Sequence, residues 1–175
     1  MKVVLSVGTH EQQFDRMVAV ADALATAGHD VTIQYGYSRQ PASAGGFDFA
    51  PSDELSRLIA RADVVISHAG PATVLQALAE GKLPIVFPRM RQFGEHVDDH
   101  QPAFARHLER NGLALVASSE AEVMALTAER PQVPAAVSAR GARVAANRSR
   151  VATSLDAWLA GRKRGVGPRS DRGQD

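Results

Sequence analysis

The sequence of 175 residues predicts an α/β fold of the Rossmann-like type, a parallel β-sheet with helices on both faces. Two observations predict it. Short continuous apolar runs, typical of strands covered on both faces, alternate with segments whose apolar residues recur at helical spacing. Each predicted strand is also followed by a helix in most of the chain, and such βα units join into parallel sheets through right-handed crossovers.

The predicted elements follow one another from residue 3 to residue 128. The first helix carries apolar residues at helical spacing from Met17 and ends at Gly28, which suits the C-terminal cap of a helix. Ser52 is predicted to cap the second helix, whose first turn holds Asp53 and Glu54, where the helix dipole favours negative charge. The predicted strands are 3–7, 31–35, 47–49, 63–67, 83–87 and 113–117. The predicted helices after the first are 52–62, 71–80, 102–110 and 120–128.

Composition indicates one globular domain, because 45% of the residues are hydrophobic and 22% are charged. There is no cysteine, which excludes a disulfide framework and a thiolate metal site. Residues 161–175 carry a net charge of +3, which leaves −2 for residues 1–160. This mildly acidic body argues against nucleic acid as the main partner.

We therefore expect a domain at 1–160 and a disordered basic tail at 161–175. The tail either keeps the chain in solution or is weakly attracted to an anionic membrane surface. No apolar run approaches the ~20 residues that span a bilayer, and the N-terminus turns polar too early for a secretory signal, so a cytoplasmic protein is expected.

Three unusual loops follow predicted strands. They are Gly8-Thr9-His10, the stretch Ser67-His68-Ala69-Gly70, and residues 89–101. In open parallel sheets the carboxyl ends of the strands share one edge, and ligands bind there. We expect these loops to converge on one site.

The start of the helix at 71–80 predicts an anion site. Pro71 suits the first turn, because the amide that it lacks would have no helical partner, and Gly70 allows a ligand to approach the backbone. The amides of Ala72 and Thr73 then point out of the helix end, where the dipole favours phosphate. The alternative is an ordinary strand-to-helix turn with His68 hydrogen-bonded in the interior.

The loop 93–101 is the second concentration of polar side chains, and its acids, imidazoles and amide suit the vicinal hydroxyls of a sugar. His96 and His100 also raise a metal site as an alternative, although their spacing needs a helix for both rings to share a face. A merely solvated polar loop is the other alternative.

Familiar nucleotide and hydrolase motifs are absent. The sequence contains no G-x-G-x-x-G after a strand, no G-x-x-x-x-G-K-[ST] and no G-x-S-x-G. Phosphate at one loop and a sugar at the next then indicate a nucleotide sugar.

Three blocks together resemble the C-terminal, donor-binding half of a family 28 glycosyltransferase: SVGTH, SHAGPATVLQALAEGKLPIVFPR and FGEHVDDHQ. The resemblance covers roughly residues 1–130 and implies the fold of the C-terminal half of a GT-B enzyme. The chain resembles the small subunit of two-subunit UDP-sugar transferases, both in N-glycan assembly on a lipid carrier and in exopolysaccharide assembly, to which FGEHVDDHQ is most similar.

The resemblance implies a set of donor-binding residues. A glutamate is common in the family at the position of Gln76, where it grips the ribose, and the neutral amide makes weaker hydrogen bonds. Arg89 is placed to reach the diphosphate or a partner. No metal or other cofactor is expected. The full set is Gly8, Thr9, His10, His68, Ala69, Gly70, Pro71, Ala72, Thr73, Gln76, Arg89, Glu95, Asp99, His100 and Gln101.

The function implied is that of a donor-binding subunit of an inverting, UDP-sugar-dependent glycosyltransferase. It would transfer a hexose or N-acetylhexosamine to a lipid-linked acceptor together with a membrane-associated partner, which would recruit it to the inner face of the membrane. The catalytic base is expected in the partner, with His68 as a weaker candidate. A helix at 134–160 is expected to carry an apolar seam, which either docks a partner or packs on this domain's own sheet. The rivals are a non-catalytic nucleotide-sugar-binding regulatory subunit, an epimerase-like protein and a metal hydrolase.

Overall fold

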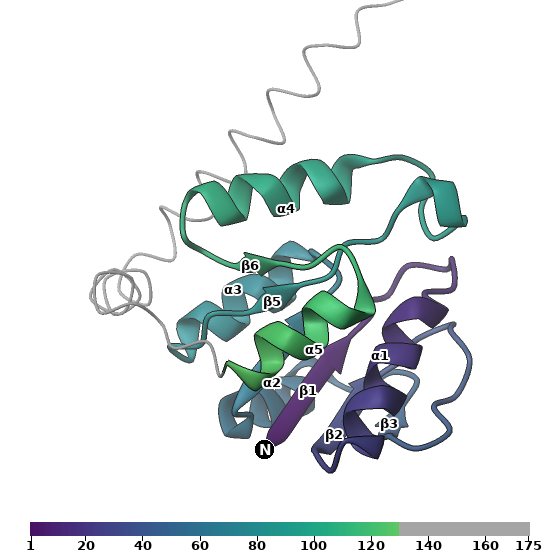
Figure 1. The fold of residues 1–175 in the computed structure, drawn as a ribbon, viewed down its shortest axis with the longest axis vertical. Coiled ribbons are helices and arrows are strands. Elements are labelled where there is room, and N and C mark those ends of the chain that lie inside the picture. Colours follow the sequence, from purple (N-terminus) through teal and green to yellow (C-terminus); the bar gives the residue numbers. More distant parts are fainter. Residues whose placement is uncertain (130–175) are drawn as a thin grey trace, which may run out of the picture.

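The computed structural model describes residues 1–129, which contain one sheet of six strands (Figure 1). The strand order is β3-β2-β1-β4-β5-β6, and every neighbouring pair is parallel. This arrangement confirms the predicted α/β class. The expected docking helix at 134–160 and the tail at 161–175 lie outside the described residues. The strands are β1 (Lys2–Ser6), β2 (Asp30–Gln34), β3 (Gly45–Phe47), β4 (Val64–Ser67), β5 (Ile85–Val86) and β6 (Leu115–Val116).

Helices cover both faces of the sheet. Figure 1 shows α1 (Asp15–Thr26) and α5 (Glu120–Ala128) in front of the strands, and α2 (Ser52–Arg61) and α3 (Pro71–Ala79) behind them. The helix α4 (His100–Arg110) packs with α3 over the end of the sheet at β5 and β6.

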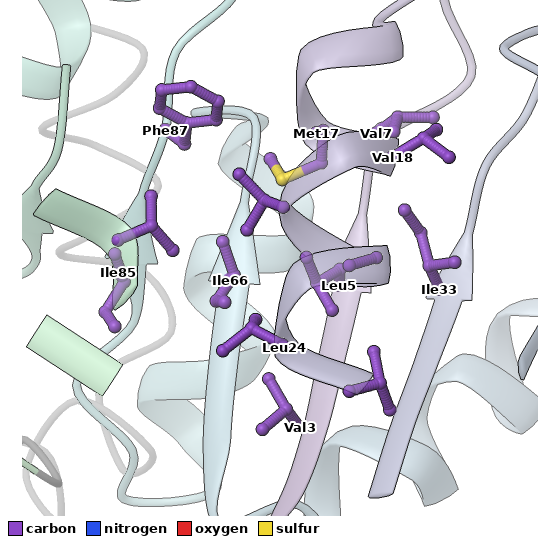
Figure 2. Close-up of a cluster of buried hydrophobic side chains, with 14 of the residues drawn as sticks. Val3, Leu5, Val7, Met17, Val18, Leu24, Ile33, Ile66, Ile85 and Phe87 are labelled. Carbon is purple, nitrogen blue, oxygen red and sulfur yellow. The ribbon is translucent and has the colours of Figure 1, made fainter. Parts of the chain in front are cut away.

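Alternation along β1 explains why its run is apolar throughout. Val3 and Leu5 join the cluster under α1 and α5 that Figure 2 draws, whereas Val4 joins the cluster under α2 and α3. Successive side chains of a strand point to opposite faces, so a strand covered on both sides needs apolar residues at every position. The same holds for β4, in which all four residues are buried.

Element boundaries differ from the prediction by more than one residue in four elements. The third strand was predicted at 47–49 and lies at Gly45–Phe47, because Gly46 packs so closely on β2 that a Cβ there would meet the Ile33 carbonyl oxygen at 2.4 Å. The runs at 83–87 and 113–117 pair over two residues each. The helix predicted from residue 102 begins at His100, which places His100 and Gln101 in its first turn.

Ser52 does not cap α2, contrary to the prediction. Pro51 occupies the cap position, and Ser52 is the first helical residue, with its carbonyl accepting a hydrogen bond from the Ser56 hydroxyl at 2.7 Å. The acids Asp53 and Glu54 lie in the first turn as predicted.

The described part of the chain, residues 1–129, holds no helix that is both long and apolar enough to cross a bilayer.

Candidate functional site

A pocket of about 480 Å³ opens at the carboxyl edge of the sheet. The loops after β1 and β4 line it from one side, and the loop before α4 with the first turns of that helix line it from the other. Eight of the fifteen residues predicted for the site line this pocket. They are Thr9, His10, His68, Ala69, Gly70, Pro71, His100 and Gln101.

His68 lines the pocket, and only 9% of its surface is exposed. Its ring lies between two glycines, since an added Cβ would come within 2.4 Å of the ring atom Nε2 from Gly8 and also from Gly70. Gly8 also has a φ of +80°, which favours glycine. The two glycines therefore make room for the His68 imidazole. Gly70 can also allow a ligand to approach the backbone closely.

The protonation state of His68 follows from its hydrogen bond to the main chain of Ser6. Its Nδ1 lies 3.1 Å from the carbonyl oxygen of Ser6, and because a carbonyl only accepts, Nδ1 carries the proton. Burial lowers the pKa of His68 to about 4, and the nearby Arg89, His10 and His96 act in the same direction. His68 is thus neutral near pH 7, and a group with so low a pKa is a weak base.

The turn into α3 has the features of the predicted anion site. Ala69 is the one non-glycine residue with positive φ (71°) within residues 1–129, and Gly70 then takes the cap position in an extended conformation. The first hydrogen bond of the helix runs from the Val74 amide to the Gly70 carbonyl at 3.1 Å, and the cap supplies no side chain. The amides of Ala72 and Thr73 precede that bond and stand outside the helical ladder.

The imidazole of His96 contacts two others along the pocket wall. The ring centroid of His96 lies 4.3 Å from that of His10 and 4.4 Å from that of His100. Burial lowers the pKa of His96, and the neighbouring His100 and His10 lower it further. Backbone and side-chain hydrogen bonds with His100 lower the pKa of Asp98. The described lining thus carries four imidazoles and no carboxylate.

Arg89 does not line the pocket. It is fully buried, and its guanidinium donates to the carbonyl oxygens of Val7 at 2.9 Å, Gln12 at 2.6 Å and Glu95 at 3.0 Å. Burial lowers the pKa of Arg89 to about 10, which still leaves it charged near neutral pH. Its main-chain amide donates to Oε1 of Gln101 at 3.1 Å. Arg89 therefore holds the loops that form the pocket in place and is not free to reach a diphosphate.

Glu95 is likewise committed to structure. Glu95 is buried, with 4% of its surface exposed. Its two carboxylate oxygens form a bidentate ion pair with the Arg16 guanidinium, at oxygen–nitrogen distances of 2.6 and 2.7 Å. The same carboxylate accepts the Met90 amide at 2.9 Å. This arrangement fastens the loop after β5 to α1.

Five other predicted residues stand behind or beside the pocket. Gly8 lies behind the His68 ring, Thr73 is buried within α3, and Ala72 is exposed beside the helix end. Gln76 donates to the Ser56 hydroxyl of α2. Asp99 accepts the Arg91 amide at 3.2 Å and lines a separate, open pocket of about 500 Å³ with Arg91 and Arg106.

Two lining residues were not among the predicted donor-binding set. His96 stood out in the sequence only as a polar or metal-binding candidate, and Phe104 lies in the stretch predicted as helix from residue 102. Phe104 belongs to the cluster between α3 and α4, with 3% of its surface exposed. No pattern in the sequence separates its role at the pocket from its role in the core.

A model of the glycosyltransferase family 28 C-terminal domain matches residues 2–131. This chain belongs to that family. The match confirms the resemblance drawn from the three sequence blocks and covers the whole region that they span.

One curated relative is similar over part of its length. The UDP-N-acetylglucosamine transferase subunit ALG13 of Yarrowia lipolytica (strain CLIB 122 / E 150) is 39% identical over 74 residues. These residues are 42% of this family 28 chain and 35% of that relative, so the chain matches about a third of the relative's length.

Solved structures share the fold at low identity. The glycosyltransferase of kitacinnamycin has a TM-score of 0.63 at 19% identity, covering 92% of this chain and 42% of that one. The glycosyltransferase SnogD from Streptomyces nogalater has a TM-score of 0.55 at 19% identity, covering 91% and 43%. This family 28 chain therefore has the fold of the C-terminal half of a GT-B glycosyltransferase, as predicted.

Proposed function

We propose that this chain is the donor-binding subunit of an inverting glycosyltransferase that uses a UDP-sugar. The observation that carries the proposal is the uncapped N-terminus of α3, whose free amides lie beside the pocket of about 480 Å³. Membership of family 28 supports a glycosyltransferase, and the named activity of the Yarrowia relative supports a UDP-sugar donor and an assembly of more than one subunit.

In this proposal the diphosphate rests on the amides of Ala72 and Thr73, and the sugar lies toward His100 and Gln101. An acceptor hydroxyl attacks the anomeric carbon from the face opposite the diphosphate and loses its proton to a base, while the bond to the diphosphate breaks. The departing oxygen gains negative charge, and the positive end of α3 stabilises it without a change in its own geometry. The transfer itself then needs no metal ion.

The base is proposed to come from a partner. His68 lies at the carboxyl edge of the sheet, where the pocket opens. Its low pKa and its burial, however, suit a neutral group that orients the donor and supports the turn. A membrane-associated subunit that presents a lipid-linked acceptor would supply the base, and would hold this chain on the cytoplasmic side of the membrane. The sugar proposed to be transferred is a hexose or an N-acetylhexosamine.

The proposal is tested by calorimetric titration of the chain with UDP and a panel of UDP-sugars, comparing Ala72→Asp with Ala72→Asn. The side chain at 72 is exposed, and an acid in the first turn of a helix stabilises it, so the aspartate variant stays folded. Its carboxylate repels the diphosphate, and we expect at least tenfold weaker binding. The asparagine, of nearly equal shape, should bind within about threefold of the wild type.

Equal binding by both variants would contradict a diphosphate at α3. If no nucleotide binds the chain alone, the titration is repeated after co-expression with candidate membrane subunits, because the donor site can require both halves. Turnover in that complex, with inversion at the anomeric carbon, separates the proposed enzyme from a regulatory subunit that only binds the donor.

A further inference from the structure

The loop before α4 brings three metal-ligating side chains to one point. One ligand atom each of His96, Asp98 and His100 lies within 4.8 Å of the other two. The carboxylate stands between the two rings, with Oδ1 at 3.4 Å from Nδ1 of His96 and in direct contact with Nδ1 of His100. The spacing of His96 and His100 favours a shared face only on a helix, whereas here the turn that leads into α4 brings them together.

The spacing is close to what a small metal ion needs. Zinc binds imidazole nitrogen and carboxylate oxygen at roughly 2.0–2.2 Å, so the ligand atoms of a tetrahedral site stand about 3.4 Å apart. Closing the widest separation, which is at most 4.8 Å, by up to about 1.4 Å and opening the contact between Asp98 and His100 would complete three ligands. His100 and Asp98 are partly exposed, with side-chain exposures of 35% and 52%, so they have room to adjust.

A second observation points to a ligand at this place. His96 is more than nine-tenths buried in the pocket wall, and the ring of His10, from the loop after β1, packs against it. The sheet thus gathers imidazoles from separate segments around one opening. Donor binding as proposed above uses His100 and Gln101, and it gives no role to the contact of His96 with His10. Nδ1 of His96 accepts the Asp98 amide at 3.3 Å, a hydrogen bond that a metal ion on this nitrogen would replace.

We propose that His96, Asp98 and His100 bind a divalent transition-metal ion of the zinc type, with the remaining coordination position open to the pocket. Imidazole ligands favour Zn²⁺, Ni²⁺ or Cu²⁺ over Mg²⁺ and Ca²⁺, which prefer oxygen. A site with three protein ligands keeps a place for water or substrate. This site goes beyond the proposed function, which needs no metal.

A consequence for the donor follows, and this consequence rests on the proposed function. A metal ion on His100 fixes the ring that would otherwise contact the sugar. Metal and UDP-sugar therefore compete, and each weakens the binding of the other by the same factor. The metal would act as an inhibitor of donor binding and not as a cofactor.

The first test is a calorimetric titration of the full-length, tag-free chain with Zn²⁺ in the absence of nucleotide. All six histidines lie in residues 1–129 and the chain has no cysteine, so few other strong sites compete. We expect one equivalent of Zn²⁺ to bind, and binding to weaken at least tenfold in Asp98→Asn and in His100→Ala. His107→Ala, on the same helix as His100 and outside the cluster, should bind within about twofold of the wild type.

Absence of saturable binding, or equal binding by all four proteins, would overturn the site. Because nucleotide is left out, this result is independent of whether the chain binds UDP-sugar. Circular dichroism melts of each variant show that it is folded, and imidazole ¹H–¹⁵N spectra should show that the metal binds the rings of His96 and His100. For the competition, the affinity for UDP-sugar should fall at least tenfold at saturating Zn²⁺, and a rise in affinity would refute it.

Discussion

The packing of His68 between two glycines makes a quantitative prediction about Gly70. Its φ of −70° suits any residue, so Gly70→Ala adds only the steric conflict of a Cβ at 2.3 Å from the His68 ring. Ordinary carbon contacts are about 3.5–4.0 Å, so the ring must move by more than 1 Å. That ring is buried and hydrogen-bonded to Ser6, and overpacking of this kind costs about 1–3 kcal/mol.

Gly8→Ala carries the same conflict, with a Cβ at 2.4 Å from the ring, and a second cost from its φ of +80°. An L-residue in that left-handed conformation costs roughly 1–2 kcal/mol. Gly8→Ala should therefore destabilise the chain by about 2–5 kcal/mol.

Double-mutant cycles with His68→Ala separate the two costs. Without the ring, Gly70→Ala should change the free energy of unfolding by less than about 0.5 kcal/mol, whereas Gly8→Ala should still cost about 1–2 kcal/mol. Urea unfolding of the six proteins, followed by circular dichroism, measures each value. If Gly70→Ala costs the same with and without the imidazole, the ring does not explain the glycine.

Two further predictions concern buried charge. Because folding lowers the pKa of His68 from 6.5 to about 4, its contribution to stability is complete above pH 6.5 and is lost as the pH falls to about 4. The wild type should lose about 3 kcal/mol more than His68→Gln over that window, as measured by urea unfolding at each pH, and parallel curves would refute it. Arg89→Lys keeps a cation but loses the planar fork, and unpaired buried carbonyls should cost at least about 3 kcal/mol, whereas Arg91→Lys, on the surface, should cost less than about 0.5 kcal/mol in thermal unfolding.

The strands and most helices could be predicted from the sequence because their signals are local. The apolar run at β4 is continuous because both faces of the strand are covered, and Pro71 marks the start of α3 by its missing amide. The convergence of three loops also follows from parallel strands, whose carboxyl ends share an edge. Residues from all three loops line the pocket at that edge, as predicted.

The direction of individual polar side chains in the loop 89–101 could not be predicted. Arg89 bonds to Val7, 82 residues away, and Glu95 pairs with Arg16, 79 residues away. Local sequence patterns do not reveal partners that are so distant in the chain. The sequence therefore predicts a ligand-binding role for both residues, whereas their side chains hold loops of the protein together. The resemblance to the family implies the donor-site residues as one set. It does not distinguish Asp99, which lines a separate pocket, from His100, which lines the pocket at the sheet edge.

The contacts of Arg89 also bear on when the pocket forms during folding. Its guanidinium joins carbonyls whose positions in the chain are up to 82 residues from its own, and its amide holds Gln101. Contacts of such long sequence separation close large loops, and the entropy of closure delays them relative to local helices. The edge of the sheet should therefore acquire its binding geometry in the last cooperative step. Amides there should also exchange with solvent through the same opening, as one unit, because one cation fastens all of these segments.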